Sequence, residues 1–186
     1  MLTITVPSTE LFDESTETFI MTKPATITLE HSLISLSKWE AKWKRPFLKE
    51  HDRKTPVEIL DYIKCMTITP NVSDSVYMAI SANSELCEQI QEYINDPMTA
   101  TTFNTIEKPA KSRQVVTSEL IYYWMIQLNI PVEFQKWHLS RLLTLIKVCE
   151  IKNAAATSRK KTSKSAIRNR NRALNAQRRA RLGTSG

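Results

Sequence analysis

Glycine is almost missing from this chain of 186 residues, and the two that it has, Gly183 and Gly186, lie at its C-terminal end. Glycine allows left-handed turns and lets the backbone approach a phosphate group closely. Nucleotide-binding loops such as the P-loop and the dinucleotide fingerprint depend on that property. The sequence before residue 183 is therefore incompatible with a glycine-rich phosphate-binding loop.

Catalytic and metal-binding motifs are lacking as well. Neither a Gly-x-Ser-x-Gly nucleophile motif nor a pair of carboxylates at a strand end occurs. His31, His51 and His138 are scattered, and the chain has no Cys-x-x-Cys or His-x-x-x-His motif. We interpret His138 as a hydrogen-bonded histidine of a helix. We expect no enzymatic activity, and hence no catalytic residue, no metal-binding residue and no cofactor.

Long apolar segments do not occur either. The N-terminal sequence MLTITVPSTELF has neither the basic start nor the continuous apolar stretch of a signal peptide. No apolar run approaches the roughly 20 residues that cross a bilayer. Cys65, Cys87 and Cys149 are odd in number, widely spaced and set in apolar patterns, which predicts buried free thiols in a reducing compartment. These features predict a cytosolic protein without a membrane partner.

Acidic residues are absent from residues 152–186, here named the basic arm. Of the 26 Lys and Arg residues in the chain, 11 lie in the basic arm and 15 in residues 1–151, together with all 19 acidic residues. Such asymmetry is typical of an arm that meets nucleic acid, an acidic partner or an anionic surface. We predict two domains, residues 1–151 and residues 152–186.

The N-terminal segment predicts a small antiparallel β-hairpin. Apolar residues alternate with threonine in residues 2–6 and again in residues 25–30, which is typical of strands with one buried face. We interpret residues 10–17 as an acidic turn between the strands, and residues 19–21 as an addition to the second. A lone hairpin needs a surface to pack on, and the helices that follow can supply it.

The middle of the chain predicts helices. Ser32 can cap a helix that reaches Lys44, and Thr55-Pro56-Val57-Glu58 is a strong helix start because it combines an N-cap, a first-turn proline and a capping-box glutamate. Two further helices are expected at residues 71–81 and 84–95. Residues 98–103 are expected to be extended, and residues 107–114 to form a polar loop.

Residues 117–149 predict a helical hairpin around Asn129-Ile130-Pro131, with a first helix buried on several sides and a second that begins at the proline. Replacing Trp124 or Trp137 by alanine is therefore expected to destabilise the protein severely. The overall expectation is a mainly α fold with the N-terminal β-hairpin, that is, α+β, in which a helical bundle carries a basic C-terminal helical arm.

The basic arm is expected to begin with a linker at residues 154–164 and to continue as a helix over residues 165–182. Ile167 and Leu174 lie seven residues apart and form a narrow apolar stripe that could dock on a partner. The arm has no aromatic residue to stack on single-stranded bases. Binding of phosphates, binding of an acidic protein and a merely solubilising tail all remain open.

Five phrases of the sequence together resemble a family of small proteins of long-tailed bacteriophages: HSLISLSKWEAKWKRPFL, DYIKCMTI, INDPMTATTF, SELIYYWMIQLNIPVEFQKWHLSRLLTLIKVCEIKN and RNRALNAQRRARLGTSG. The family resembles tail assembly chaperones of the gene module near the tape-measure gene. The resemblance implies a non-catalytic protein of the host cytoplasm that binds the tape-measure protein and helps recruit tail tube subunits. Two further partners are left open, a second copy of the chain and nucleic acid bound through the arm.

The residues predicted to contact partners are two tryptophans of the first expected helix and seven residues of the arm. Tryptophans at such positions are more often core residues than partner contacts. The predicted contact residues are Trp39, Trp43, Arg168, Arg170, Arg172, Leu174, Arg178, Arg179 and Arg181. The alternative function is a structural component of the virion, such as a minor tail, connector or capsid-associated protein, whose basic arm contacts a neighbouring subunit or DNA.

Overall fold

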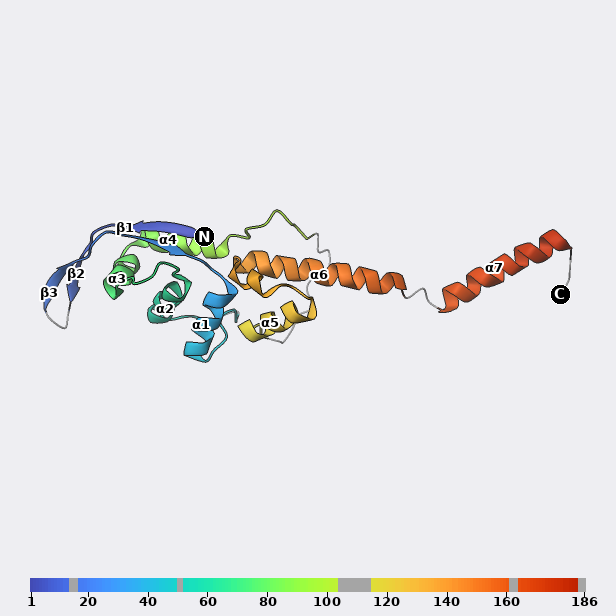
Figure 1. The fold of residues 1–186 in the computed structure, drawn as a ribbon, viewed down its shortest axis with the longest axis horizontal. Coiled ribbons are helices and arrows are strands. Elements are labelled where there is room, and N and C mark those ends of the chain that lie inside the picture. Colours follow the sequence, from blue (N-terminus) through green and yellow to red (C-terminus); the bar gives the residue numbers. More distant parts are fainter. Residues whose placement is uncertain (14–16, 50–51, 104–114, 161–163, 184–186) are drawn as a thin grey trace. The chain divides into compact units, whose positions relative to one another are not determined.

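The computed structural model of the chain describes residues 1–13, 17–49, 52–103, 115–160 and 164–183. The fold is mainly α, with a small antiparallel β-hairpin at the N-terminus, as the sequence predicts (Figure 1). The chain divides into two compact units, residues 1–146, here named the body, and residues 147–186. Both this division and the boundary predicted after residue 151 fall within one helix, α6 (Leu139–Lys160).

The β-hairpin is longer than expected because it consists of two successive strand pairs. Strand β1 (Leu2–Val6) pairs with β4 (Ala25–Leu29), and β2 (Glu10–Asp13) pairs with β3 (Thr18–Met21). Residues 10–13, which we expected in an acidic turn, therefore form a strand, and residues 19–21 pair with it rather than extend β4. Leu11 and Phe12 of β2 lie opposite Ile20 and Phe19 of β3, and these apolar cross-strand pairs favour pairing over a turn.

Alternation of side chains explains how β1 and β4 pack. Ile4 and Ile27 face each other across the pair and are buried, whereas Thr3 and Thr28 face each other on the more exposed side. The buried face rests on helices, since β1 contacts α3 (Asp74–Ala82) and α4 (Ser84–Asn95), and Figure 1 shows β1 running along α4. The hairpin thus obtains the supporting surface that a lone hairpin needs.

Capping signals set the first two helices where the sequence predicts them. Helix α1 (Leu33–Trp43) begins after the N-cap Ser32, and α2 (Pro56–Met66) after the N-cap Thr55, each with a capping box. The helices α3 and α4 confirm two further predictions. One apolar core joins these four helices to the strands through side chains such as Trp39, Tyr62, Ile80 and Ile90.

The predicted helical hairpin is correct for its first half only. Helix α5 (Ser118–Gln127) ends at a turn in which Asn129 has a φ of 52°, but Pro131 opens only the short 3-10 helix η1 (Val132–Lys136). Helix α6 begins at Leu139, whose N–H donates to the backbone oxygen of His31, 2.7 Å away. His138 lies just before this helix, not inside it, and pairs with Ser32 in a β-bridge.

Helix α5 is also less buried than expected. Ile121 and Met125 face a second core with α1 and α6, whereas Tyr123 and Ile126 are exposed. Trp124 and Trp137 are half-buried. The expectation of severe destabilisation at those two tryptophans is therefore revised, because truncating a half-buried side chain removes less packing.

The basic arm begins with helix where a linker was predicted. Helix α6 continues to Lys160, so most of residues 154–164 are helical. After residues 161–163, helix α7 (Lys164–Leu182) confirms the predicted arm helix, and Gly183 follows it with a φ of 64°, typical of a helix C-terminus. Residues 98–103 form no strand, and residues 104–114, which include the predicted polar loop, lie outside the described residues.

Candidate functional site

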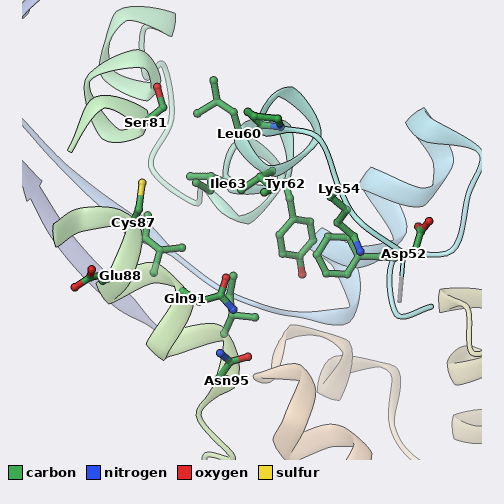
Figure 2. Close-up of a pocket in the computed structure, with 15 residues that line it drawn as sticks. Asp52, Lys54, Leu60, Tyr62, Ile63, Ser81, Cys87, Glu88, Gln91 and Asn95 are labelled. Carbon is green, nitrogen blue, oxygen red and sulfur yellow. The ribbon is translucent and has the colours of Figure 1, made fainter. Parts of the chain in front are cut away.

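An apolar groove lies between α2 and α4 of the body. It has a volume of about 720 Å³ and opens to solvent. Figure 2 shows side chains of α2 on one wall, side chains of α4 on the other, and Lys54 and Asp52 at one end. The groove is lined by Phe47, Asp52, Lys54, Pro56, Ile59, Leu60, Tyr62, Ile63, Ser81, Cys87, Glu88, Ile90, Gln91, Ile94 and Asn95.

The α2 wall of the groove consists of apolar side chains that are not buried in the core. Tyr62, Ile63 and Met66 turn inwards and are buried, as expected from helical spacing. Ile59 and Leu60 also lie on α2, but Ile59 is 50% exposed and lines the groove. Helix α2 thus has an apolar surface that the body leaves uncovered.

Aromatic packing makes one end of the groove rigid. Phe47 stacks on Tyr62 with a centroid distance of 3.9 Å, and the edge of Trp39 meets Phe47 from the core at 5.0 Å. The Lys54 ammonium lies 4.4 Å from the centroid of Phe47 in a cation–π contact. Partial burial lowers the pKa of Lys54, so the groove end holds a partly desolvated cation.

The acidic groups behind this end are already paired. Arg45 binds Glu58 and Asp52 at 2.5 and 2.6 Å, and hydrogen bonds from Thr55 help to lower the pKa of Glu58. The Arg45 guanidinium likewise lowers the pKa of Asp52. These two carboxylates therefore stay ionised, and the charges of Arg45 and the nearby Lys54 balance theirs, which leaves little net charge to offer to a ligand.

Helix α4 adds an acidic face to the other wall. A shallow hollow on its outer surface is lined by Glu88, Gln91, Glu92, Asn95 and Asp96. Three of these residues, Glu88, Gln91 and Asn95, also line the groove, so the two depressions adjoin along the helix. The exposed carboxylates of this face can attract a basic partner, while the groove can bury apolar side chains.

Of the two tryptophans predicted to contact a partner, Trp39 cannot do so in this fold. Its side chain is 0% exposed and donates a hydrogen bond from Nε1 to the backbone oxygen of Glu58 at 2.9 Å. That prediction is corrected, because Trp39 fills the core. Trp43 is half-buried and donates to a carboxylate oxygen of Asp61 at 2.9 Å, so a partner contact at Trp43 stays a prediction.

The predicted residues of the arm all lie on one helix. Leu174 on α7 is 43% exposed, and the six arginines are exposed as well. These are Arg168, Arg170, Arg172, Arg178, Arg179 and Arg181. The helix brings Arg170, Leu174 and Arg178 onto one face, because residues four apart lie one turn from each other.

Nucleophilic chemistry has little support in the groove. Cys87 lies in its wall, and burial raises the pKa of this thiol and of the Cys65 thiol, which disfavours the reactive thiolate. The three cysteines are free thiols, as predicted, although each is half-buried rather than buried. Across the described ranges, no cluster of three His, Cys, Asp or Glu side chains could hold a metal ion.

Sequence reasoning missed the groove itself. Its lining combines residues of α2 and α4 that lie about thirty positions apart, and no local motif marks it. One signal was present, since Val57, Ile59 and Leu60 add apolar side chains outside the inward-facing stripe of α2. An apolar surplus on a helix of a water-facing body indicates a partner-binding surface.

Comparison with known proteins gives no match, since no family model, no curated protein and no solved structure is significantly similar to this chain. No helix in the described part of the chain has both the length and the apolar composition needed to cross a membrane.

Proposed function

We propose that this chain is a tail assembly chaperone of a long-tailed bacteriophage. In this role it binds the tape-measure protein without catalysis in the host cytoplasm and promotes assembly of the tail tube subunits. The observation that best supports the proposal is the open, apolar groove between α2 and α4.

The groove suits a helical client for a physical reason. An amphipathic helix presents apolar side chains three and four positions apart, and such a row can lie in an apolar groove. Long client helices left unpartnered would otherwise associate through the same side chains. Ile59 and Ile94 offer apolar contacts along the groove, while Glu88 and Gln91 on its rim stay in contact with water.

A pair of charge insertions on α2 tests this function. Ile59 lines the groove, whereas Val57, on the same helix and 67% exposed, does not. Each variant, Ile59→Glu and Val57→Glu, is produced together with the tape-measure protein of the same phage, and the soluble complex is measured by affinity purification. We expect Ile59→Glu to lose at least tenfold of the complex, because a carboxylate in an apolar groove is costly to desolvate. Val57→Glu is expected to match the unmodified chain.

The alternative function is that of a structural component of the virion. Its basic arm would contact a neighbouring subunit or packaged DNA, for which the exposed arginines of α7 are suited. Mass spectrometry of purified particles distinguishes the two functions. Stoichiometric amounts of the chain in the particles contradict the chaperone, whereas its absence, with recovery of the tape-measure complex from infected cells, contradicts the virion component.

A further inference from the structure

We propose that the groove between α2 and α4 binds the basic helix α7 of a second copy of this chain. In this contact Leu174 enters the apolar groove, and Arg170 and Arg178 meet the carboxylates on the face of α4. The proposal concerns self-association and stands apart from the chaperone function, since both partners are the same protein.

Charge on the groove side is the first observation. Residues 65–106 contain five acidic side chains and no Lys or Arg. Three of them, Glu85, Glu88 and Glu92, lie on one exposed face of α4, because residues three and four apart share a helix face. In the part of the chain that the structure describes, no salt bridge engages these three carboxylates. They are therefore available to a cationic partner.

Charge on the arm side is the complement of this face. Helix α7 carries seven Lys and Arg residues and no acidic residue. Leu174 is flanked at one turn on either side by Arg170 and Arg178, so an apolar side chain and two cations project together. Arg172 and Arg179 lie on the opposite side of the helix, as the rotation of about 100° per residue implies.

The dimensions of the two helices agree. Glu85 and Glu92 lie seven residues apart, about 10.5 Å along α4, and Arg170 and Arg178 lie eight residues apart, about 12 Å along α7, with Leu174 midway between them. With 19 residues, α7 is about 28 Å long and can cover the whole of α4, whose 12 residues span about 18 Å. An apolar anchor beside charge pairs of similar spacing fits the recognition mode of a helix in a groove.

The one cation at the groove end does not oppose this contact. Lys54 sits over Phe47, next to Asp52, on the side of the groove away from Cys87 and Glu88 (Figure 2). The two acids behind it, Glu58 and Asp52, are both paired with Arg45, and their two negative charges are balanced by Arg45 and Lys54 together. The attraction for an arginine-rich helix therefore comes from α4, and the arm is expected to lie against that wall.

A second copy, rather than the arm of the same chain, is the expected donor. The groove lies in one compact unit of the chain and α7 in the other, so the two can meet across copies with each unit intact. Contact within one chain is the competing outcome that cross-linking separates.

Cross-linking between two distinguishable full-length copies tests the proposal. The first copy carries Cys65→Ser and Cys149→Ser, so that Cys87 in the groove is its single thiol. The second copy is tagged, carries serine at all three cysteine positions, and has Gln177→Cys next to Leu174 on α7. A short bismaleimide joins two thiols, and the yield of the mixed dimer is measured by mass. A high yield of mixed dimers is expected when α7 of one copy lies in the groove of another.

Charge reversal supplies the matched control. Arg170→Glu with Arg178→Glu in the second copy is expected to lower the mixed-dimer yield at least fivefold. Arg172→Glu with Arg179→Glu changes the net charge equally and is expected to change the yield less than twofold. Introducing Glu85→Arg and Glu92→Arg in the first copy is expected to restore cross-linking to the Arg170→Glu, Arg178→Glu arm. Circular dichroism confirms that each variant keeps its helices.

Three outcomes overturn the proposal. The first is the absence of mixed dimers at or above the concentration at which the unmodified chain self-associates. The second is an equal loss with both charge-reversal pairs, which would show attraction without a specific face. The third concerns an additional single chain that carries both Cys87 and Gln177→Cys. Cross-linking within this chain, without any mixed dimer between the two separate copies, would place the arm in its own groove. None of these results depends on a client, so they are distinguishable from failure of the chaperone function.

Discussion

The indole nitrogen of Trp39 lies 2.9 Å from the backbone oxygen of Glu58 and donates a hydrogen bond to it inside the core. This bond joins α1 to the first turn of α2. The Glu58 side chain completes the same junction, since it accepts from Thr55 and binds Arg45. These contacts hold α2 in place, and the outer surface of α2 forms one wall of the groove.

Replacing Trp39 is expected to be the most destabilising change among the four tryptophans. Trp39→Ala removes a fully buried ring and leaves the Glu58 carbonyl without its donor, a loss of about 3 to 5 kcal/mol in the free energy of unfolding. Trp124→Ala is the control, because Trp124 is half-buried, and we expect it to cost less. Urea denaturation measures both. Equal losses would contradict the assignment of Trp39 to the core.

Stability is expected to fall as the pH drops from about 6.5 to 4 because of His31. Burial, and to a smaller extent the nearby His138, lowers the pKa of His31 to about 4 from its ordinary 6.5. The unfolded chain then takes up a proton that the folded chain excludes, so the stabilisation is complete above pH 6.5 and lost by pH 4. The shift corresponds to a loss on the order of 3 kcal/mol.

The substitution His31→Asn tests this pH dependence. The Tyr62 hydroxyl and Nδ1 of His31 share a hydrogen bond of 2.6 Å, and an asparagine side chain offers both an acceptor oxygen and a donor nitrogen to replace it. Urea midpoints measured from pH 7.5 to 4 should decline less steeply in the variant. Burial also lowers the pKa of His138, so part of the decline is expected to remain. Parallel profiles in the two proteins would rule out His31 as the titrating group.

Local signals in the sequence predicted the helices well because they act between neighbouring residues. Thr55 and Glu58 form the capping box that begins α2, and Ser32 begins α1, as their spacing indicates. The alternation of Ile4 and Val6 with threonine likewise predicted the buried face of β1. These arrangements need no knowledge of the rest of the fold.

Contacts between residues that are distant in the sequence explain which predictions were wrong. Pro131 signals a helix start, but His138 is drawn into a bridge with Ser32, and α6 starts one residue later. Trp137 instead stacks on Phe134 with a centroid distance of 4.1 Å. The groove between α2 and α4 is also a product of tertiary packing. Apolar periodicity shows that a helix has a buried face, but not which apolar residues the core leaves exposed.

Binding of the chain to polyanions is expected to depend on the basic arm. Retention on a heparin column should fall steeply with salt concentration, because each phosphate or sulfate contact releases counterions. A chain ending at Ile151 lacks the 11 basic residues of the arm and should pass through unretained. Its thermal melt should stay close to that of the full chain, since the body is a compact unit of its own. Unchanged retention would place the polyanion site on the body.

The β2–β3 pair is expected to open without unfolding the body. Phe12 and Phe19 lie directly opposite each other with their ring centroids 5.1 Å apart, yet they are 54% and 66% exposed. A cross-strand pair of this kind contributes about 0.2 to 1 kcal/mol. Phe12→Thr with Phe19→Thr should therefore shift the urea midpoint only slightly while speeding amide exchange in β2 and β3.

The matched change in the inner pair, Ile4→Thr with Ile27→Thr, removes two buried side chains and should destabilise the whole body by several kcal/mol. A similar loss of stability in both double variants would mean that the outer strand pair folds as part of the core, in contrast to its exposure in the structure.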